Sequence, residues 1–186
     1  RIIYKCLTCI MKPFMTISCE IEKCLFNSED DVIGEIIKTI VAATSSIYVM
    51  HFWFSWKPIA DALIDAHKKG VKINVLTDQR SLVKYMQDNQ TTYSISVLEH
   101  LSDNGIERLA VYFNHLMHHK IIIVDDVVIT GTLNLFKKSI HEDTESIIFI
   151  KSEDVCEFYK KEFESIFKNA LDLQSAMNAA KDQPRD

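Results

Sequence analysis

The stretch IYVMHFWFSWKPIADALIDAHKKGVKINVL, from Ile47 to Leu76, decides the fold because it holds a strand, a helix and a second strand in succession. Ile47 to Phe54 is a run of apolar and aromatic residues typical of a strand. Pro58 suits the first turn of a helix, and Gly70 marks the end of that helix. Val71 to Leu76 is the next strand. This order predicts a right-handed crossover between two parallel strands, so we expect an α/β protein.

Segments on both sides of this unit extend the pattern. Apolar residues at helical spacing predict a helix from Asp31 to Ala43, and another helix is expected near Ser94 to Ser102. The polar stretch from Gln87 to Tyr93 is interpreted as a mobile loop. Further strands and a closing amphipathic helix are expected at Ile106–Phe113, Lys120–Val124, Val127–Thr130, Ser146–Ile150 and Glu153–Leu171. The expected architecture is a mixed, largely parallel β-sheet flanked by helices.

Length and composition bound the domain organisation. The chain has 186 residues, of which 47% are hydrophobic and 25% are charged, and this composition excludes a disordered or fibrous protein. No apolar run approaches the roughly 18 residues that a membrane span needs. We expect an N-terminal extension over residues 1–20, one domain over 21–172, and a frayed tail over 173–186.

Charge and cysteine content narrow the surroundings of the protein. A net charge of −5 and a pI near 5.8 argue against a broad basic surface for nucleic acid, although a local basic cleft remains open. The five cysteines, an odd number, fit reduced thiols in a cytoplasmic or other intracellular compartment. Four cysteines cluster, at Cys6, Cys9, Cys19 and Cys24. Zinc binding is the alternative for this cluster, but its spacing favours buried or incidental thiols.

The chemistry-bearing residues concentrate in HLMHHKIIIVD, from His115 to Asp125. Alternation along the strand places His118 and Lys120 on one face and His119 on the other. An imidazole and an ammonium that point into the same space suggest an anion site. The alternative is a polar strand entrance with solvated histidines.

A second element, TGTLN from Thr130 to Asn134, follows the next strand and returns to the same end of the sheet. The pattern H-x-K-x4-D, formed by His118, Lys120 and Asp125, followed by G-T-x-N resembles the signature of the phospholipase D superfamily. The resemblance covers most of the chain, from Glu22 to Asn169. It is closest to the short members with one motif copy, which include bacterial endonucleases and the mitochondrial cardiolipin hydrolase or Zucchini type.

The resemblance implies a metal-independent phosphodiesterase without a cofactor. Two motif copies make one active site in this family, so a chain with a single copy implies a homodimer. His118 would attack phosphorus to give a phosphohistidine, while His118 of the partner subunit would protonate the leaving alcohol and later activate water. Lys120 and Asn134 would stabilise the charge that develops on the phosphate oxygens.

Other residues near the motif are expected to support this chemistry. Glu145 matches the family's carboxylate after the motif and would hold a histidine ring in the required tautomer, unless it is a surface strand residue. Thr132 is expected to contact the substrate phosphate, and His115 is expected at the cleft mouth, close to the substrate. Gly131 and Asp125 are structural members of the motif, and Asp125 is expected to accept backbone hydrogen bonds.

Three functions remain open at this point. The favoured one is a nuclease that cleaves DNA or RNA. The second is a lipid hydrolase acting on cardiolipin or phosphatidylcholine, because the aromatic run from Phe52 to Phe54 and Trp56 could line a lipid cleft as well as form core. A segment before Arg1 could associate such a protein with a membrane. The third is a catalytically inactive nucleic-acid-binding module, suggested by Thr132 and by Leu135-Phe136 in place of the usual family residues.

Lysines are the expected contacts to the backbone of a polynucleotide substrate. The candidates are Lys57, Lys68, Lys69, Lys72, Lys137 and Lys138. If they act together, cleavage should weaken as the salt concentration rises.

Overall fold

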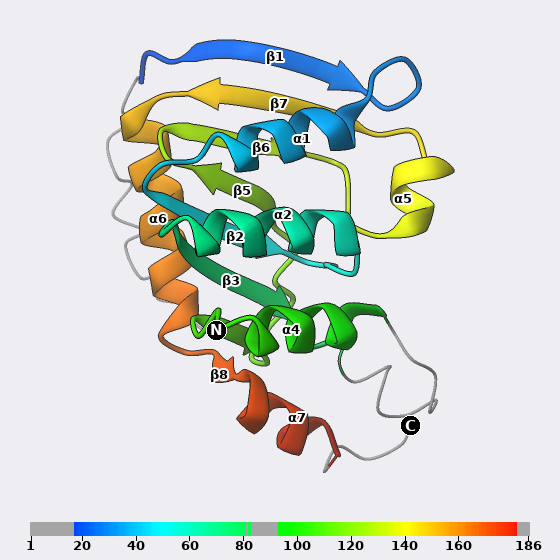
Figure 1. The fold of residues 1–186 in the computed structure, drawn as a ribbon, viewed down its shortest axis with the longest axis vertical. Helices are drawn as coiled ribbons and strands as arrows, with labels where there is room; N and C mark the ends of the chain where they lie inside the picture. The colour runs from blue at the N-terminus through cyan, green and yellow to red at the C-terminus, as the bar shows by residue number, and fades with distance from the viewer. Residues whose placement is uncertain (1–16, 81, 83–92, 182–186) are drawn as a thin grey trace, which may run out of the picture.

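The computed structural model describes residues 17–80, 82 and 93–181. Its strands are β1 (Glu20–Phe26), β2 (Ser46–His51), β3 (Lys72–Asp78), β4 (Leu109–Tyr112), β5 (Lys120–Val124), β6 (Val127–Gly131), β7 (Ser146–Lys151) and β8 (Leu171–Asp172). Its helices are α1 (Val32–Val41), α2 (Lys57–Lys68), α4 (Tyr93–Asp103), α5 (Lys137–His141), α6 (Glu153–Phe167) and α7 (Leu173–Lys181). Over these residues the strands form one eight-stranded sheet in the order β1-β7-β6-β5-β2-β3-β4-β8 (Figure 1). The predicted α/β class is confirmed.

The sheet combines a parallel centre with antiparallel flanks. β2, β3 and β4 run parallel because helices α2 and α4 connect them in turn. The other neighbouring pairs are antiparallel, and β5 turns tightly into β6 at Asp125, which has a φ of 51°. The sheet is therefore mixed, as predicted, but its parallel part is smaller than the sequence suggests.

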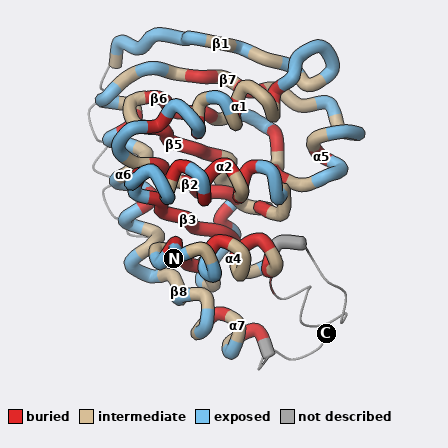
Figure 2. The backbone as a smooth tube through the Cα atoms, viewed as in Figure 1, coloured by how far each residue is buried: buried red, intermediate tan, exposed pale blue. Residues whose placement is uncertain are grey.

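Helices cover both faces of the sheet, with α1, α2 and α4 on one face and α6 on the other (Figure 1). Each face has its own apolar cluster because side chains alternate along the strands. On β2, for example, Val49 packs in the first cluster and Met50 in the second. The central strands β2, β3, β5 and β6 are buried over most of their length, as the burial colouring in Figure 2 shows.

Helix α1 illustrates how the sequence specifies these elements. Its buried residues Val32, Ile36 and Ile40 recur every four positions and form one face of the helix. The Asp31 side chain caps the helix by accepting a hydrogen bond of 2.9 Å from the Gly34 N–H. The predicted helix from Asp31 to Ala43 therefore differs from α1 only at its ends.

Several predicted boundaries differ from the structure, among them the start of β4, which is Leu109 instead of Ile106. β2 ends at His51 instead of Phe54, because the chain leaves the sheet there and Phe54 bridges to Leu135. The closing helix ends at Phe167, and Leu171 belongs to β8, where it pairs with Val111 of β4. The frayed tail expected from residue 173 is instead helix α7 up to Lys181, which buries Ala176 and Ala180 in the core.

Two further expectations concern the ends and the long connection. β1 begins at Glu20, at the edge of the predicted extension, and pairs with β7. Most of the mobile loop predicted from Gln87 to Tyr93 lies outside the described residues, and Tyr93 begins α4.

The order of the strands brings their polar ends together. Lys120, at the start of β5, lies opposite His51, at the end of β2. His51 in turn pairs with Thr77 near the end of β3. On the other side of β5, β6 ends at Gly131, which pairs with Ile147 near the start of β7. One end of the sheet therefore carries most of the residues that the sequence singles out, whereas Asp125 lies at the other end.

Candidate active site

His118 and Lys120 lie side by side at this end of the sheet. His118 is exposed in the loop before β5, and Lys120 is the first residue of the strand. The Lys120 Nζ lies 3.4 Å from the His118 Nε2 and donates to the His118 carbonyl oxygen at 3.3 Å. The Phe52 ring packs against both, with centroids 4.7 Å from the imidazole and 5.4 Å from the ammonium. The structure thus brings the imidazole and the ammonium together against an aromatic wall, as the alternation predicts.

This arrangement sets the protonation of both groups. Partial burial, followed by the charge of Lys120, lowers the pKa of His118 below its ordinary value, and the nearby Asp78 opposes the shift. Burial also lowers the pKa of Lys120, while the Glu145 carboxylate acts in the opposite direction. The lowered pKa favours the unprotonated form of the His118 imidazole at neutral pH.

Two side chains at the carboxyl end of β3, those of its last residue and of the next one, hold the loop that carries His118. Asp78 is fully buried and accepts a hydrogen bond of 2.8 Å from the Met117 N–H through its Oδ2. The Gln79 Nε2 donates to the carbonyl oxygen of Phe113 at 2.8 Å. The backbone immediately before His118 is therefore fixed from the carboxyl end of β3. Sequence reasoning missed Asp78, although an aspartate at the carboxyl end of a buried parallel strand is a signal that could have found it.

His51 is a second residue that the sequence did not flag. It is buried beside Lys120 across the β2–β5 pair, and its Nδ1 lies 3.2 Å from the Trp53 carbonyl oxygen. Burial, followed by the charge of Lys120, lowers the pKa of His51 to about 3. A neutral imidazole therefore stands behind the ammonium group of the site.

Gly131 and Thr132 close the end of β6 against β7. A Cβ on Gly131 would lie 2.0 Å from the Ser146 carbonyl oxygen, so this close approach requires glycine. The Thr132 N–H donates to the same oxygen at 3.0 Å, and the Thr132 hydroxyl accepts from the Ser146 N–H at 3.0 Å. The hydroxyl keeps its own hydrogen for donation, and the residue is exposed at this end of the sheet.

Asn134 and Glu145 are linked through Ser139. The Ser139 hydroxyl accepts from the Asn134 N–H at 2.9 Å and donates to the Glu145 carboxylate. In the described part of the chain, the Asn134 Oδ1 is buried without a hydrogen-bond partner. Glu145 thus contacts a serine rather than a histidine of its own chain, although its charge reaches Lys120. The sequence did not anticipate Ser139, which is buried in the short helix α5.

The remaining histidines and aromatic residues of the motif region separate into different environments. His115 is exposed in the loop before β5. His119 faces α6, with its Nε2 3.7 Å from a Glu162 carboxylate oxygen, which agrees with the predicted opposite face. Among the aromatic residues, Phe54 is buried in the core, whereas Trp53 is half-buried and packs on Phe136 at 5.7 Å between ring centroids.

Asp125 stands at the far end of β5, away from His118. Its carboxylate accepts hydrogen bonds from the backbone N–H groups of Thr44, Ser45 and Ser46, at 2.8, 3.0 and 2.9 Å. Although partial burial opposes the shift, these bonds hold the pKa of Asp125 below its ordinary value. The structure thus gives this residue the backbone-binding role expected from its place in the turn.

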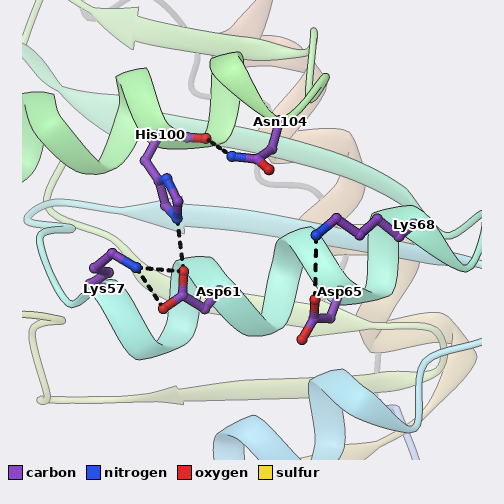
Figure 3. A network of polar contacts seen from close by, with 6 residues as sticks. All are labelled: Lys57, Asp61, Asp65, Lys68, His100 and Asn104. Carbon is purple, nitrogen blue, oxygen red and sulfur yellow. Dashed lines mark hydrogen bonds and ion pairs between the residues drawn. The ribbon is translucent and has the colours of Figure 1, made fainter.

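Three of the six predicted lysine contacts form ion pairs with nearby carboxylates. On α2, Lys57 pairs with Asp61 at 2.9 Å and Lys68 lies 3.8 Å from Asp65 (Figure 3). Lys138 lies 3.6 Å from an Asp143 carboxylate oxygen. These ion pairs reduce the positive charge that the three lysines can offer to a phosphate backbone.

The described residues hold neither a membrane-spanning helix nor an evident metal cluster. Within them, no helix has the length and apolarity needed to cross a bilayer. No group of three or more His, Cys, Asp or Glu residues in the same ranges is arranged to hold a metal ion. Of the clustered cysteines, Cys6 and Cys9 lie outside the described residues, and Cys19 and Cys24 are exposed with free thiols.

Comparison with known proteins identifies the family. The model of the family described as "Cardiolipin synthase, PLD-like domain" matches residues 36–167 of the chain. The match runs from within α1 to the end of α6 and includes the whole site. The chain therefore belongs to this phospholipase D-like family, and the resemblance noted in the motif is confirmed.

The chain is similar in sequence to a cardiolipin hydrolase and to a phospholipase D. A mitochondrial cardiolipin hydrolase from Canis lupus familiaris is 27% identical over 147 residues, which cover 78% of this chain and 54% of that protein. A phospholipase D from Rickettsia typhi is 30% identical over 125 residues, covering 67% of this chain and 57% of that protein. The chain thus spans slightly more than half the length of these relatives.

A solved structure shows the same fold. The phospholipase D family member Nuc from Salmonella typhimurium superimposes with a TM-score of 0.73 at 24% sequence identity. The match covers 83% of this chain and 98% of Nuc. At this identity the likeness concerns the fold.

Proposed function

We propose that this chain is a metal-independent phosphodiesterase that cleaves DNA or RNA through a phosphohistidine intermediate. The observation that carries the proposal is the exposed His118, whose Nε2 lies 3.4 Å from the Lys120 ammonium in a family of phospholipase D type. A neutral imidazole next to a fixed cation can attack a phosphodiester whose charge that cation balances.

The proposed reaction has two steps, formation of the phosphohistidine and its hydrolysis. In the first, the lone pair of the His118 Nε2 forms a bond to phosphorus, and the bond from phosphorus to the leaving oxygen breaks. That oxygen takes a proton from His118 of the partner subunit, which enters this step in its protonated form. In the second step, the same partner imidazole removes a proton from water, the oxygen of the water bonds to phosphorus, and the P–N bond breaks. Lys120 and the Asn134 side-chain amide donate hydrogen bonds to the non-bridging oxygens in both steps.

The second imidazole requires a homodimer because the chain holds one copy of the motif. His118 is exposed, so it is accessible to a second subunit across a twofold axis. In this assembly Glu145, which is anchored by Ser139, is proposed to orient a histidine ring, and Thr132 and His115 are proposed to contact the substrate.

The second candidate function is hydrolysis of a phospholipid. The naming of similar proteins as mitochondrial cardiolipin hydrolases supports this candidate. The aromatic residues Phe52 and Trp53 at the site could also contact acyl chains. We rank nucleic acid first because the chain resembles the short single-motif members, which include nucleases, and because bases can stack on the same rings.

The test compares substrates and traps the intermediate. The wild-type protein is offered single-stranded DNA, single-stranded RNA, cardiolipin vesicles and phosphatidylcholine vesicles in the presence of chelator. We expect cleavage of a polynucleotide and a phosphoryl adduct on His118, detected by mass spectrometry after acid-free quenching. His118→Asn should abolish both, whereas His119→Asn, which alters the neighbouring imidazole on the opposite face, serves as the matched control.

Each outcome separates the candidates. Turnover of lipid without turnover of nucleic acid would reverse the ranking. Binding of nucleic acid without turnover of any substrate would indicate the inactive binding module. The mechanism would be contradicted if cleavage of a diester required a divalent metal, or if it persisted in His118→Asn.

A further inference from the structure

Arg80 is a charged residue of the site region that the mechanism does not use. It follows β3, and its side chain is 47% exposed while its partner Asp78 is completely buried. The Arg80 Nη1 lies 3.1 Å from both carboxylate oxygens of Asp78. The buried carboxylate therefore anchors one end of a guanidinium whose remainder stands at the surface.

One carboxylate group connects Arg80 to the backbone that carries the nucleophile. The Oδ2 atom of Asp78 that contacts Arg80 also accepts the hydrogen bond from the Met117 N–H, at 2.8 Å. Met117 directly precedes His118. Arg80 and the residue that precedes His118 thus contact the same buried carboxylate. The charge of Arg80 also contributes to the lowered pKa of His118, which agrees with this closeness.

The Arg80 guanidinium has hydrogen-bond donors that its contacts with Asp78 do not use. Within the described residues, its contacts to Asp78 use Nη1, while Nε and Nη2 remain for another acceptor. Arginine suits phosphate because its planar fork donates two parallel hydrogen bonds. A half-exposed cation that is anchored by Asp78 and whose charge reaches His118 is suited to an anionic group of a substrate bound at His118.

We propose that Arg80 binds a second phosphate of the same substrate molecule, next to the phosphodiester that His118 attacks. This site rests on the proposed phosphodiesterase function and deepens it. The ligand is a molecule with two phosphodiester groups. A polynucleotide supplies the second group as its adjacent backbone phosphate, and cardiolipin supplies it as its second headgroup phosphate. Substrates with one phosphodiester leave Arg80 unused.

The experiment compares Arg80→Gln with the wild type on matched substrates that contain one or two phosphodiesters. The nucleic-acid pair is a dinucleoside monophosphate and the corresponding trinucleotide. The lipid pair is phosphatidylcholine and cardiolipin in vesicles of equal surface charge. Lys151→Gln is the charge-loss control, because Lys151 pairs with Asp126 at the opposite end of the sheet.

Arg80→Gln should lower kcat/KM about 10-fold or more on the two-phosphate member of the pair that the wild type cleaves, mainly by raising KM. It should change kcat/KM on the one-phosphate member by less than about twofold, and Arg80→Lys should restore part of the loss. Which pair shows the effect identifies the source of the second phosphate. Lys151→Gln should affect both members equally.

Equal losses on both members would overturn the proposal and assign Arg80 to neutralising Asp78 alone. If no diester is turned over at all, the proposed function fails but the second-phosphate site is still tested by binding. Fluorescence anisotropy should then show that Arg80→Gln binds the labelled trinucleotide more weakly than the wild type does, while both proteins bind the dinucleoside monophosphate equally. If the two proteins bind the trinucleotide with the same affinity, the second-phosphate site is overturned. A thermal melt confirms that each variant is folded, and Arg80→Lys replaces Arg80→Gln if the latter is not.

Discussion

His51 makes the fold sensitive to acid because it is buried in its neutral form beside a lysine. The side chain is 3% exposed, and its Nδ1 contacts the Trp53 carbonyl oxygen at 3.2 Å. Its pKa is lowered from 6.5 to about 3 by burial and then by the charge of Lys120, while the contact with Trp53 opposes the shift. Protonating this ring in the folded protein would place a second cation next to Lys120 inside the core.

The sign and size of the effect follow from proton linkage. Between pH 6.5 and about 3, the unfolded chain binds a proton at His51 and the folded chain does not. The free energy of unfolding therefore falls as the pH falls through this window. The slope is about 1.4 kcal/mol for each pH unit, so lowering the pH from 6.5 to 4.5 should remove about 2 to 3 kcal/mol.

The assay is urea unfolding of wild type and His51→Leu at pH 7.5 and at pH 4.5. At pH 7.5 the variant loses the contact with Trp53, which should cost about 1 kcal/mol. Between the two pH values the wild type should lose about 2 to 3 kcal/mol more than His51→Leu. Val49→Ala, which creates a cavity on the same strand and face, should be destabilised yet keep the pH dependence of the wild type. If His51→Leu shows the same pH dependence as the wild type, the reasoning about His51 is refuted.

Three other predictions concern the ends of β5 and β6. Gly131→Ala should destabilise the protein by roughly 1 to 3 kcal/mol, because its Cβ would lie 2.0 Å from the Ser146 carbonyl oxygen. Urea unfolding measures the loss, and unchanged stability would contradict the close approach. Asp125→Ala should lower the free energy of unfolding by about 2 to 3 kcal/mol, because it removes hydrogen bonds to three backbone N–H groups. The kcat per folded molecule should not change, and a lower kcat would place Asp125 in the reaction. In an NMR titration, His118 should have a pKa below 6.5, and Lys120→Met should raise it; an unchanged or lower value in the variant would contradict the coupling of the two charges.

Local sequence patterns were sufficient for the elements that have a regular period. The four-residue repeat of Val32, Ile36 and Ile40 predicts α1, and alternation predicts that His118 and Lys120 share a face. These signals depend on neighbours within one or two turns of a helix or a few residues of a strand, so one sequence contains them. By contrast, the two-residue strand β8 has no periodic signal of its own, because pairing with β4 creates it.

The residues that position the site could not all be predicted, because their contacts join parts of the chain that are far apart in the sequence. The hydrogen bond from the Met117 N–H to Asp78 joins residues 39 positions apart, and its importance appears once the loop lies against β3. The turn position of Asp125 predicts that its carboxylate accepts backbone hydrogen bonds, but the donors, such as Ser46, lie 79 positions away. His51 resembles any polar residue at the end of a strand until its pairing with Lys120 is known.

The measurement that tests the central claim most directly is the activity of a mixed dimer. Wild-type and His118→Asn chains carrying different affinity tags are co-expressed, and dimers with one chain of each kind are isolated by two successive purifications. Because the proposed reaction uses both imidazoles at one phosphorus, the mixed dimer should be inactive and should form no turnover-competent phosphohistidine. A mixed dimer with about half of the wild-type activity, or a wild-type monomer that is fully active, would show that one His118 is enough and would contradict the shared site.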